Sequence, residues 1–293
     1  MLEGTAIKLT TKDENVETEE VFELKSDQEE TDTRVVLYAM YGAKIGYDFV
    51  RVRSPDSDIF FILLHHAPNI CTQILFDTGT GNKKRLLNVT KKAIELGPVY
   101  CTALLALHAL TGCDTTSSLK GIGKIKPTKI LKKMPKFKEH LSNLGKSWTL
   151  SDSVASEIEH FMCCIYGFPR IKKIDMVRLH ILRRKCDNKE KLDSSKTIDL
   201  ASFPPCWSSL QQHLKRVNFQ VRIWKLANEN FPEIPDPTLH GWNYVGDSLE
   251  PTWSSKPILP TELVDLMEEK IDSDSEEEVI YESDVSVDSD LDF

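Results

Sequence analysis

Hydrophobic positions recur with two different periods in the first half of this chain. From Thr33 onward they return every three or four residues, which predicts an amphipathic helix that stops at Gly46. Short apolar or alternating runs are typical of strands. They predict strands over Phe49–Arg53, Ile59–Leu64 and Thr72–Phe76, with a further short strand near Val21–Leu24.

Helical periodicity takes over in the second half. We expect helices over Thr90–Leu96, from Pro98 to Leu110, and over residues 127–146, 152–166, 175–186 and 206–230. Proline suits the first turn of the second of these helices because its fixed φ is already helical. Strands that alternate with helices, followed by helices alone, predict an α/β fold. It would have a partly parallel sheet flanked by helices and a helical C-terminal extension.

Changes in composition divide the 293 residues into five parts. The chain begins with a polar lead-in and ends with an acidic, serine-rich tail that we expect to be disordered. Prolines and tryptophans mark an arm before the tail. The predicted parts are a lead-in at 1–28, an α/β domain at 29–140, a helical extension at 141–230, the arm at 231–271 and the tail at 272–293.

The formal net charge of −8 hides two opposite regions. Residues 268–293 hold twelve acidic residues and one lysine, which leaves a net charge of +3 on the rest of the chain. Residues 120–146 hold nine lysines and one acidic residue, and 170–191 hold nine basic residues against three acidic ones. Such asymmetry favours a polyanionic partner for the body of the protein.

Cysteine usage and hydropathy exclude several classes of protein. The seven cysteines are irregularly spaced and include no Cys-x-x-Cys pair, so neither a disulfide framework nor a closed zinc site is expected. Apolar runs all fall short of the roughly 18–20 residues that a membrane span needs. The first residues also lack the pattern of a signal peptide.

Five carboxylates stand out because they come in short groups at predicted element ends. Glu30 and Asp32 open the first helix, Asp56 and Asp58 follow a strand, and Asp114 follows the helix that starts at Pro98. Two-metal phosphodiester hydrolysis needs several carboxylates around divalent ions, and Mg²⁺ and Mn²⁺ prefer such hard oxygen ligands. The five are therefore candidate metal ligands, with the three aspartates Asp56, Asp58 and Asp114 as candidate catalytic residues.

A glycine turn and lysines follow the last of these aspartates. Gly121-Ile122-Gly123 offers backbone N–H groups that suit phosphate oxygens. Lys124, Lys126 and Lys129 add positive charge directly after the turn. We therefore predict that Gly121, Gly123 and these three lysines bind DNA or RNA.

This order of motifs resembles the flap-endonuclease/XPG-type branch of the PIN-like nucleases. The resemblance covers roughly residues 24–135 and implies a PIN-like domain over 29–140, metal-dependent cleavage of nucleic acid by Mg²⁺ or Mn²⁺, and a K⁺ ion at the Gly121–Gly123 turn. The family carries two more metal-binding aspartates in an earlier αβ unit. Only about 28 residues precede Glu30 here, so we expect a carboxyl-terminal piece of a longer protein whose metal site is incomplete.

The segments around the acidic residues also resemble a group of mobile-element-derived animal proteins. Glu29–Arg34, Arg53–Asp58 and Leu107–Thr116 carry this resemblance, as do Leu239–Trp242 and Pro251–Trp253. It implies a transposon-derived protein located in the nucleus or the cytoplasm, with the nucleus favoured. Many members end in a cysteine-rich segment, whereas this chain ends in Asp, Glu and Ser.

Each signal also has a plain structural explanation. Asp32 or Asp114 could simply cap a helix, and Ser54–Asp58 could be an ordinary turn. The lysines of 120–146 could be a solvated helix face, His108 a core residue, and Asp77–Gly81 a hairpin turn. The functional alternative to an active nuclease is therefore a non-catalytic module that binds nucleic acid or another partner.

Overall fold

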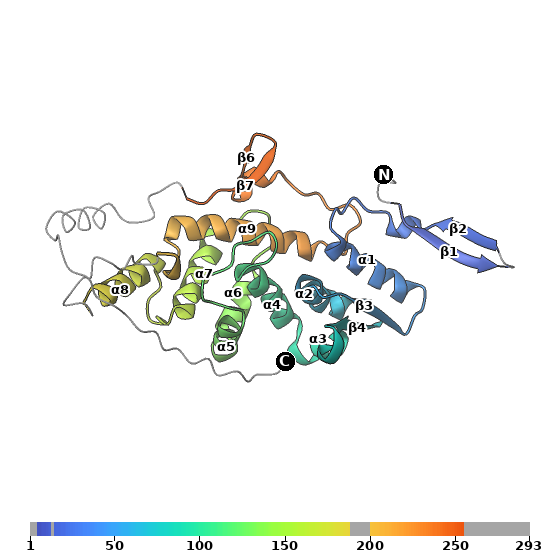
Figure 1. Ribbon diagram of the computed structural model, residues 1–293, viewed down its shortest axis with the longest axis horizontal. Coiled ribbons are helices and arrows are strands. Elements are labelled where there is room, and N and C mark those ends of the chain that lie inside the picture. Colours follow the sequence, from blue (N-terminus) through green and yellow to red (C-terminus); the bar gives the residue numbers. More distant parts are fainter. Residues whose placement is uncertain (1–4, 13–14, 188–199, 255–293) are drawn as a thin grey trace.

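The computed structural model describes residues 5–12, 15–187 and 200–254 (Figure 1). The described chain is a mixed α/β protein, about 52% helical with small mixed sheets. The predicted disordered tail at 272–293 and the end of the arm lie outside the described residues. No single described helix is long and apolar enough to cross a membrane, and among the described helices only the pair Val89–Leu96 and Pro98–Leu110, bent by 108°, has the combined length and composition.

The strands form two separate hairpins and one three-stranded sheet. In the sheet, of order β3-β4-β5, β4 pairs parallel with β3 and antiparallel with β5. This sheet is smaller and less parallel than the α/β pattern predicts. The strands are β1 (Ile7–Lys12), β2 (Asn15–Glu20), β3 (Phe49–Arg53), β4 (Gln73–Thr78), β5 (Arg85–Asn88), β6 (Trp242–Val245) and β7 (Ser248–Pro251).

The helices pack against one face of this sheet and extend beyond it. Those of the first half are α1 (Thr31–Lys44), α2 (Ser57–His66), α3 (Val89–Leu96) and α4 (Pro98–Leu110). Those of the second half are α5 (Ile125–Lys133), α6 (Lys136–Ser142), α7 (Asp152–Ile165), α8 (Ile174–Asp187) and α9 (Trp207–Lys225). The predicted helices at the Thr33, Thr90, Pro98, 152, 175 and 206 positions are thereby confirmed within a few residues.

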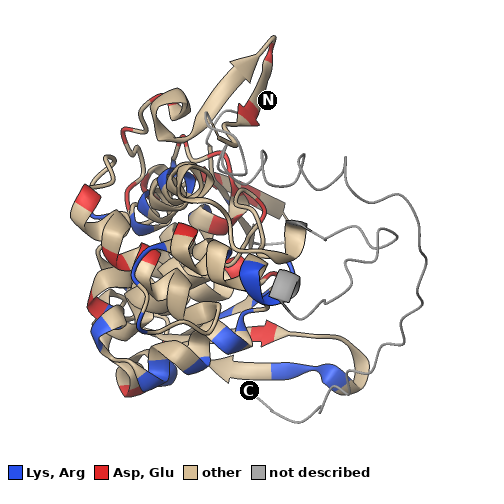
Figure 2. Cartoon of the chain, turned by 90° about the vertical axis from the view of Figure 1, so that its left-hand side faces the viewer, with Lys and Arg blue, Asp and Glu red and all other residues tan. Residues whose placement is uncertain are grey.

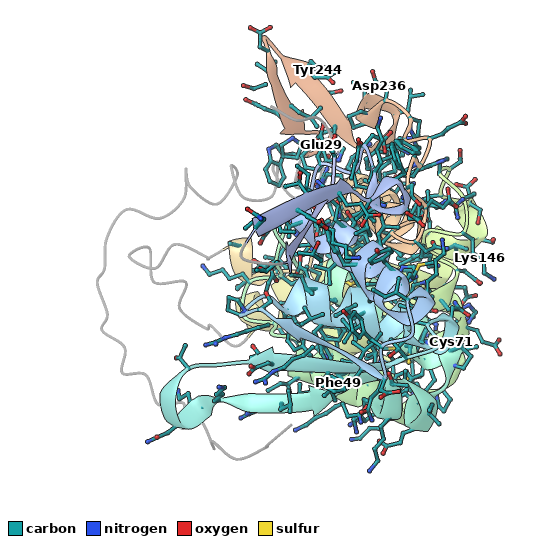
Figure 3. The ribbon with its side chains drawn as sticks, turned by 90° about the vertical axis from the view of Figure 1, so that its right-hand side faces the viewer. Glu29, Phe49, Cys71, Lys146, Asp236 and Tyr244 are labelled. Atoms are coloured by element: carbon teal, nitrogen blue, oxygen red, sulfur yellow. The ribbon has the colours of Figure 1, made fainter. Side chains whose placement is uncertain are left out.

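Helices cover one face of the sheet in the described structure. Gly42 of α1 allows close packing, because a Cβ there would lie 2.7 Å from the Val50 side chain of β3. Phe76 of β4 contacts Phe60 of α2 from the same side. Phe49 stands on the other, exposed side of β3 (Figure 3). The β4–β5 hairpin, with exposed Lys and Arg residues at its tip, projects from this end (Figure 2).

The larger of two hydrophobic core clusters in the described residues joins the predicted α/β domain to the helical extension. The core cluster runs from Val36 of α1 through α2 and α4 to Trp224 of α9. Helix α9 packs against α4, α2 and α7, so it lies across the earlier elements rather than beyond them (Figure 1). This placement brings residues near 220 next to residues near 30, 58 and 114.

One predicted strand is a helix. Ile59–Leu64 lies within α2, which begins at Ser57 and has Asp56 as its N-cap. The helix is buried against α1, α4 and α9, and apolar residues therefore surround nearly its whole circumference. A short, fully apolar run cannot be assigned to strand or helix by periodicity alone, and the capping aspartate was the signal for a helix.

Two other expectations were wrong at the level of element boundaries. The predicted strand near Val21–Leu24 is a turn of 3₁₀ helix, and the strands β1 and β2 precede it as an exposed hairpin. The predicted helix over 127–146 is two helices, α5 and α6, because Met134 leaves the helical conformation directly before Pro135. A residue that precedes proline is pushed out of the α region, which explains the break.

The arm of residues 231–254 is ordered and packs on α9. It forms the 3₁₀ turn η5 (Pro237–His240) and the β6–β7 hairpin, which carries Tyr244 at the far end of the molecule from Phe49 (Figures 1 and 3). Gly241 has a φ of +88° and a Cβ there would lie 2.7 Å from the Gln212 carbonyl. The close approach of the arm to α9 therefore requires glycine at this position.

Candidate metal-binding site

The five predicted carboxylates line one pocket. Glu30 and Asp32 come from the start of α1, Asp56 and Asp58 from the start of α2, and Asp114 from the loop after α4. The pocket has a volume of about 280 Å³ and is completed by Thr31, Thr115, Gln220 and Trp224. Three segments that are separate in sequence thus place their acidic residues around one space.

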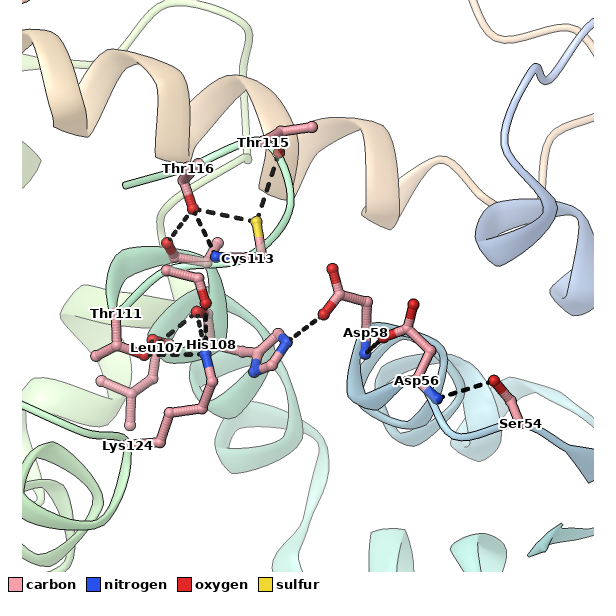
Figure 4. Close-up of polar contacts among 12 residues, drawn as sticks. Ser54, Asp56, Asp58, Leu107, His108, Thr111, Cys113, Thr115, Thr116 and Lys124 are labelled. Atoms are coloured by element: carbon pink, nitrogen blue, oxygen red, sulfur yellow. Dashed lines mark hydrogen bonds and ion pairs between the residues drawn. The ribbon is translucent and has the colours of Figure 1, made fainter. Parts of the chain in front are cut away.

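Two helix N-termini hold the first four carboxylates. Glu30 is the N-cap residue of α1, and its side chain makes no capping hydrogen bond. Asp56 is the N-cap of α2, and its Oδ1 accepts a hydrogen bond of 2.8 Å from the Asp58 N–H (Figure 4). The positive ends of both helix dipoles favour negative charge at this place. The structure therefore gives a capping role to Asp56, for which the sequence analysis offered only a turn, whereas neither Asp32 nor Asp114 is an N-cap of a described helix.

A buried histidine fixes Asp58. His108 Nε2 lies 2.6 Å from Asp58 Oδ1, and only 2% of His108 is exposed (Figure 4). Its ring stacks on Phe61 with the centroids 4.3 Å apart. The contact sets the orientation of the carboxylate and leaves Asp58 Oδ2 without a hydrogen bond to any described protein group. Such hydrogen bonds from outside are what orient the carboxylate ligands of metal sites.

A tightly bonded loop presents Asp114. The Cys113 and Thr116 backbones exchange hydrogen bonds, and Thr116 Oγ1 donates to the Ala109 carbonyl at 2.6 Å. Gly112 has a φ of +110°, and a Cβ there would lie 2.7 Å from Ser118 Cα. The loop is therefore folded back on the end of α4, with Asp114 exposed at its surface.

The carboxylates of the pocket influence one another. Burial, followed by the charges of Asp58 and Asp114, raises the pKa of Glu30. Burial raises the pKa of Asp32 to about 6, with further contributions from Asp56, Glu30, Asp58 and Asp114. Like charges that share a low-dielectric space disfavour ionisation. A cation in the pocket would relieve this repulsion.

The donor set suits a hard divalent cation. All five side chains offer carboxylate oxygens, and Mg²⁺ and Mn²⁺ take such ligands. Within residues 5–12, 15–187 and 200–254, however, no three acidic, histidine or cysteine residues already form a ligand set around one point. Bound ions would have to draw the carboxylates together. Without an ion this approach is unfavourable, because the raised pKa values of Glu30 and Asp32 show that the pocket already disfavours their negative charge.

Lys124 has a different role from the one predicted. Its Nζ donates to the Gly112 carbonyl at 2.6 Å and to the His108 carbonyl at 3.1 Å (Figure 4). Burial lowers its pKa, partly offset by the charges of Cys113 and Asp58. The ammonium group therefore caps the C-terminal end of α4 and faces inward, which corrects its assignment as a phosphate-binding lysine.

The other predicted nucleic-acid residues lie on the surface. Gly121 and Gly123 form an exposed turn in which the Ile122 N–H donates to the Leu119 carbonyl and Gly121 has a φ of +73°. Lys126 and Lys129 are exposed on α5. Their predicted role in binding DNA or RNA, and that of a K⁺ ion at the turn, stay predictions.

The sequence analysis assigned no role in the site to His108, Gln220 or Trp224. His108 was interpreted as a core residue, and it is one, but it also bonds Asp58. Its place six residues before Asp114 was the available signal. Gln220 and Trp224 of α9 stand more than 100 residues beyond the last of the acidic ligands, and no local pattern marks them.

His65, His66 and Cys113 make structural contacts. His66 Nε2 lies 2.8 Å from the Trp224 carbonyl, and His65 Nδ1 lies 3.0 Å from Thr102 Oγ1. Cys113 Sγ contacts the hydroxyl of Thr116 at 3.1 Å. Asp77 and Thr78 end β4, and Gly79 begins the connection to the antiparallel strand β5, so the Asp77–Gly81 segment belongs to a hairpin.

Comparisons with known proteins supply no family for this chain. Neither a scan against protein-family models, nor a search of curated proteins, nor a search of solved structures found a match. The functional conclusion therefore depends on the geometry of the pocket.

Proposed function

We propose that this chain is a metal-dependent phosphodiesterase acting on DNA or RNA, related to the PIN-like nucleases. One observation carries the proposal: five carboxylates from three separate segments line a single pocket, in which burial and the neighbouring carboxylates raise the pKa of Glu30 and of Asp32. Repulsion between clustered carboxylates destabilises a fold, so a solvated surface gains nothing from such a cluster. A site for divalent cations, in contrast, requires several carboxylates close together.

The residues of the pocket would divide the work. Glu30, Asp32, Asp56, Asp58 and Asp114 would hold Mg²⁺ or Mn²⁺, which when bound would stabilise charge on the phosphate oxygens and lower the pKa of a nearby water. Asp56 is held by the N-terminus of α2 and Asp58 by His108. These contacts would keep two carboxylates in place before substrate arrives, and preorganised charge is the main contribution a protein makes to such chemistry.

The nucleic acid would approach over the exposed Gly121–Gly123 turn and α5. Lys126 and Lys129 are available on that surface, whereas Lys124 is not. Backbone N–H groups and lysines at such a position contact phosphates without reading sequence. We also keep the proposals of a mobile-element ancestry and a nuclear location, which fit an enzyme of DNA.

The decisive experiment is a cleavage assay with an aspartate variant. The chain should cut single-stranded and flap substrates with Mn²⁺, and Asp58→Asn should lower the rate at least about 100-fold, as loss of a metal-positioning group does. Asp152→Asn, an exposed carboxylate at the start of α7, is the matched control. Equal cleavage by the Asp58 variant and the unmodified chain would disprove the assignment.

A specific observation also favours a second candidate, a non-catalytic nucleic-acid-binding module. The described carboxylates form no ready ligand set, while α5 and α6 expose a row of lysines. Binding by such a module would fall steeply with salt and would not change with divalent ions. Salt-dependent binding of a substrate that is never cut, with or without Mn²⁺, would select this alternative.

A further inference from the structure

A second cavity lies on the other side of the Asp114 loop. It has a volume of about 560 Å³, within the usual range for ligand sites. Lys120, Arg178 and Arg216 line it, and no carboxylate does. Cys206, His213 and Trp253 are among its other lining residues. The cavity is thus the opposite in charge of the acidic pocket.

Arg216 carries a buried positive charge with no acidic partner in the described structure. Only 3% of the residue is exposed, and Nη1 donates to the carbonyls of Gly241 at 2.9 Å and Thr252 at 2.7 Å. The guanidinium lies 5.8 and 5.7 Å from the rings of Trp242 and Trp253. Burial lowers its pKa. The carbonyls and rings orient the guanidinium but do not neutralise its charge. An anion in the cavity would therefore offset the desolvation free energy of this buried charge.

The surroundings of Cys206 in the cavity also favour negative charge. Its Sγ lies 3.3 Å from Ser208 Oγ and 3.2 Å from Ser209 Oγ, at the N-terminus of α9. Burial alone raises the pKa of the thiol, but the hydrogen bonds from Ser208 and Ser209 and the charge of Arg178 lower it on balance. Hydrogen-bond donors and positive charge that stabilise a thiolate also suit other anions.

One face of α9 lines both the acidic pocket and the cavity. Ser209, His213 and Arg216 face the cavity, and Gln220 and Trp224 face the acidic pocket. The spacing of four, three, four and four residues keeps them on one side of the helix. The stripe is ~22 Å long at 1.5 Å per residue. The loop between α4 and α5 separates the two spaces, with Asp114 on one side and Lys120 on the other.

We propose that this cavity binds a terminal phosphate monoester, the charged end of a nucleic-acid strand or of a free nucleotide. Lys120, Arg178 and Arg216 supply the positive charge, and Trp253, 64% exposed at the rim, offers a ring for the adjoining base. Only the assignment to a strand end rests on the proposed phosphodiesterase function. A strand held here would run along α9 towards the five carboxylates.

Calorimetry on the full chain in EDTA tests the proposal without the metal site. The probes are a dinucleotide with a terminal phosphate, the same dinucleotide without it, and the mononucleotide. We expect the terminal phosphate to tighten binding at least tenfold. Tight binding of both phosphorylated probes identifies the monoester itself as the ligand, whereas tight binding of the dinucleotide alone identifies a strand end. Equal affinity with and without the phosphate would overturn the proposal.

Two lysine variants locate the binding. Lys120→Gln should weaken binding of the phosphorylated dinucleotide at least fivefold, whereas Lys91→Gln, at an exposed lysine of α3 outside the cavity, should change its affinity less than twofold. An equal loss in both variants would mean general attraction to lysines and would reject the cavity. These measurements omit divalent ions, so they test the cavity separately from Mn²⁺-dependent cleavage. A chain that cuts but does not bind the terminal phosphate would overturn only the cavity proposal, and a chain that binds but does not cut would overturn only the proposed phosphodiesterase function.

Discussion

His108 and Asp58 are 50 positions apart in the chain, yet His108 Nε2 lies 2.6 Å from Asp58 Oδ1 in the folded protein. The pair joins the end of α4 to the start of α2, inside the wall of the acidic pocket. The imidazole orients the Asp58 carboxylate through Oδ1, so that Oδ2 is available to a metal ion. The relationship connects the packing of the core with the chemistry of the pocket.

Replacing His108 should weaken metal binding while the fold persists. His108→Phe keeps a ring on Phe61 and removes the nitrogen that holds Asp58. We expect Mn²⁺ affinity, measured by calorimetry, to fall by about 10- to 100-fold, as it does when an outer partner of a metal ligand is lost. His160→Phe, another buried histidine whose Nε2 lies 3.0 Å from a backbone carbonyl, is the control. Equal Mn²⁺ affinity in the His108 variant and the unmodified chain would contradict the role.

The acidic pocket should make stability depend on pH. The pKa of Asp32 is raised from 3.8 to about 6, first by burial and then by neighbouring carboxylates. The folded chain therefore holds this proton more tightly than the unfolded chain, and stability falls as pH rises from about 4 to about 6. Asp32→Asn should raise the free energy of unfolding at pH 8 by about 1 kcal/mol after allowance for solvent screening, with little effect near pH 4.

Urea unfolding at a series of pH values in EDTA measures this difference. Asp247→Asn, an exposed carboxylate in the β6–β7 turn, should show no such trend. Adding Mn²⁺ should stabilise the unmodified chain more at pH 8 than at pH 5, because the ion competes with the proton for the same oxygens. A gain for Asp32→Asn that is the same at pH 4 and pH 8 would exclude a titrating Asp32 as its source.

Lys124 and Lys126 should have opposite phenotypes although they are two residues apart. Lys124→Met removes the donor to the Gly112 and His108 carbonyls and should lower the free energy of unfolding by about 1–3 kcal/mol. Lys126→Met should leave stability unchanged but reduce the slope of log affinity for nucleic acid against log salt by about 0.7–0.9. Thermal unfolding and binding titrations at several salt concentrations distinguish the two. A stable Lys124 variant with a reduced salt slope would restore the original phosphate-binding assignment.

Two glycines of the same loop should also differ. Gly112 has a φ of +110° and no room for a Cβ, which would lie 2.7 Å from Ser118 Cα. Gly112→Ala should therefore lower the free energy of unfolding by more than about 2 kcal/mol and displace Asp114. Gly121 has a φ of +73° in open space, so Gly121→Ala should cost only about 1–2 kcal/mol. Denaturant unfolding compares them, and equal costs would show that crowding at Gly112 is relieved by the loop.

The candidate site was more predictable than the sheet around it. Carboxylates at element starts are visible as short acidic groups, and Glu30, Asp32, Asp56, Asp58 and Asp114 all line the predicted site. The Ile59–Leu64 run was taken for a strand, because a helix buried on all sides loses the periodicity that identifies it. Here an error in secondary structure left the site intact, since Asp56 starts the segment in either case.

Long-range packing set the limit of prediction. Nothing near Gln220 or Trp224 indicates that α9 closes the acidic pocket, because this contact depends on the tertiary path of the chain. The inward turn of Lys124 is equally invisible, since a lysine after a glycine turn has the same sequence whether it faces solvent or a helix end. Both depend on residues distant in sequence or on side-chain direction.

Because α9 follows all five carboxylates in the chain, the acidic pocket is completed late in synthesis. Ribosomes that add about 5–20 residues per second would release Asp114 on the order of ten seconds before Trp224. During this interval the nascent chain carries all five carboxylates but lacks one wall of the pocket. The pocket therefore stays open on one side until α9, the last of the described α-helices, has been translated.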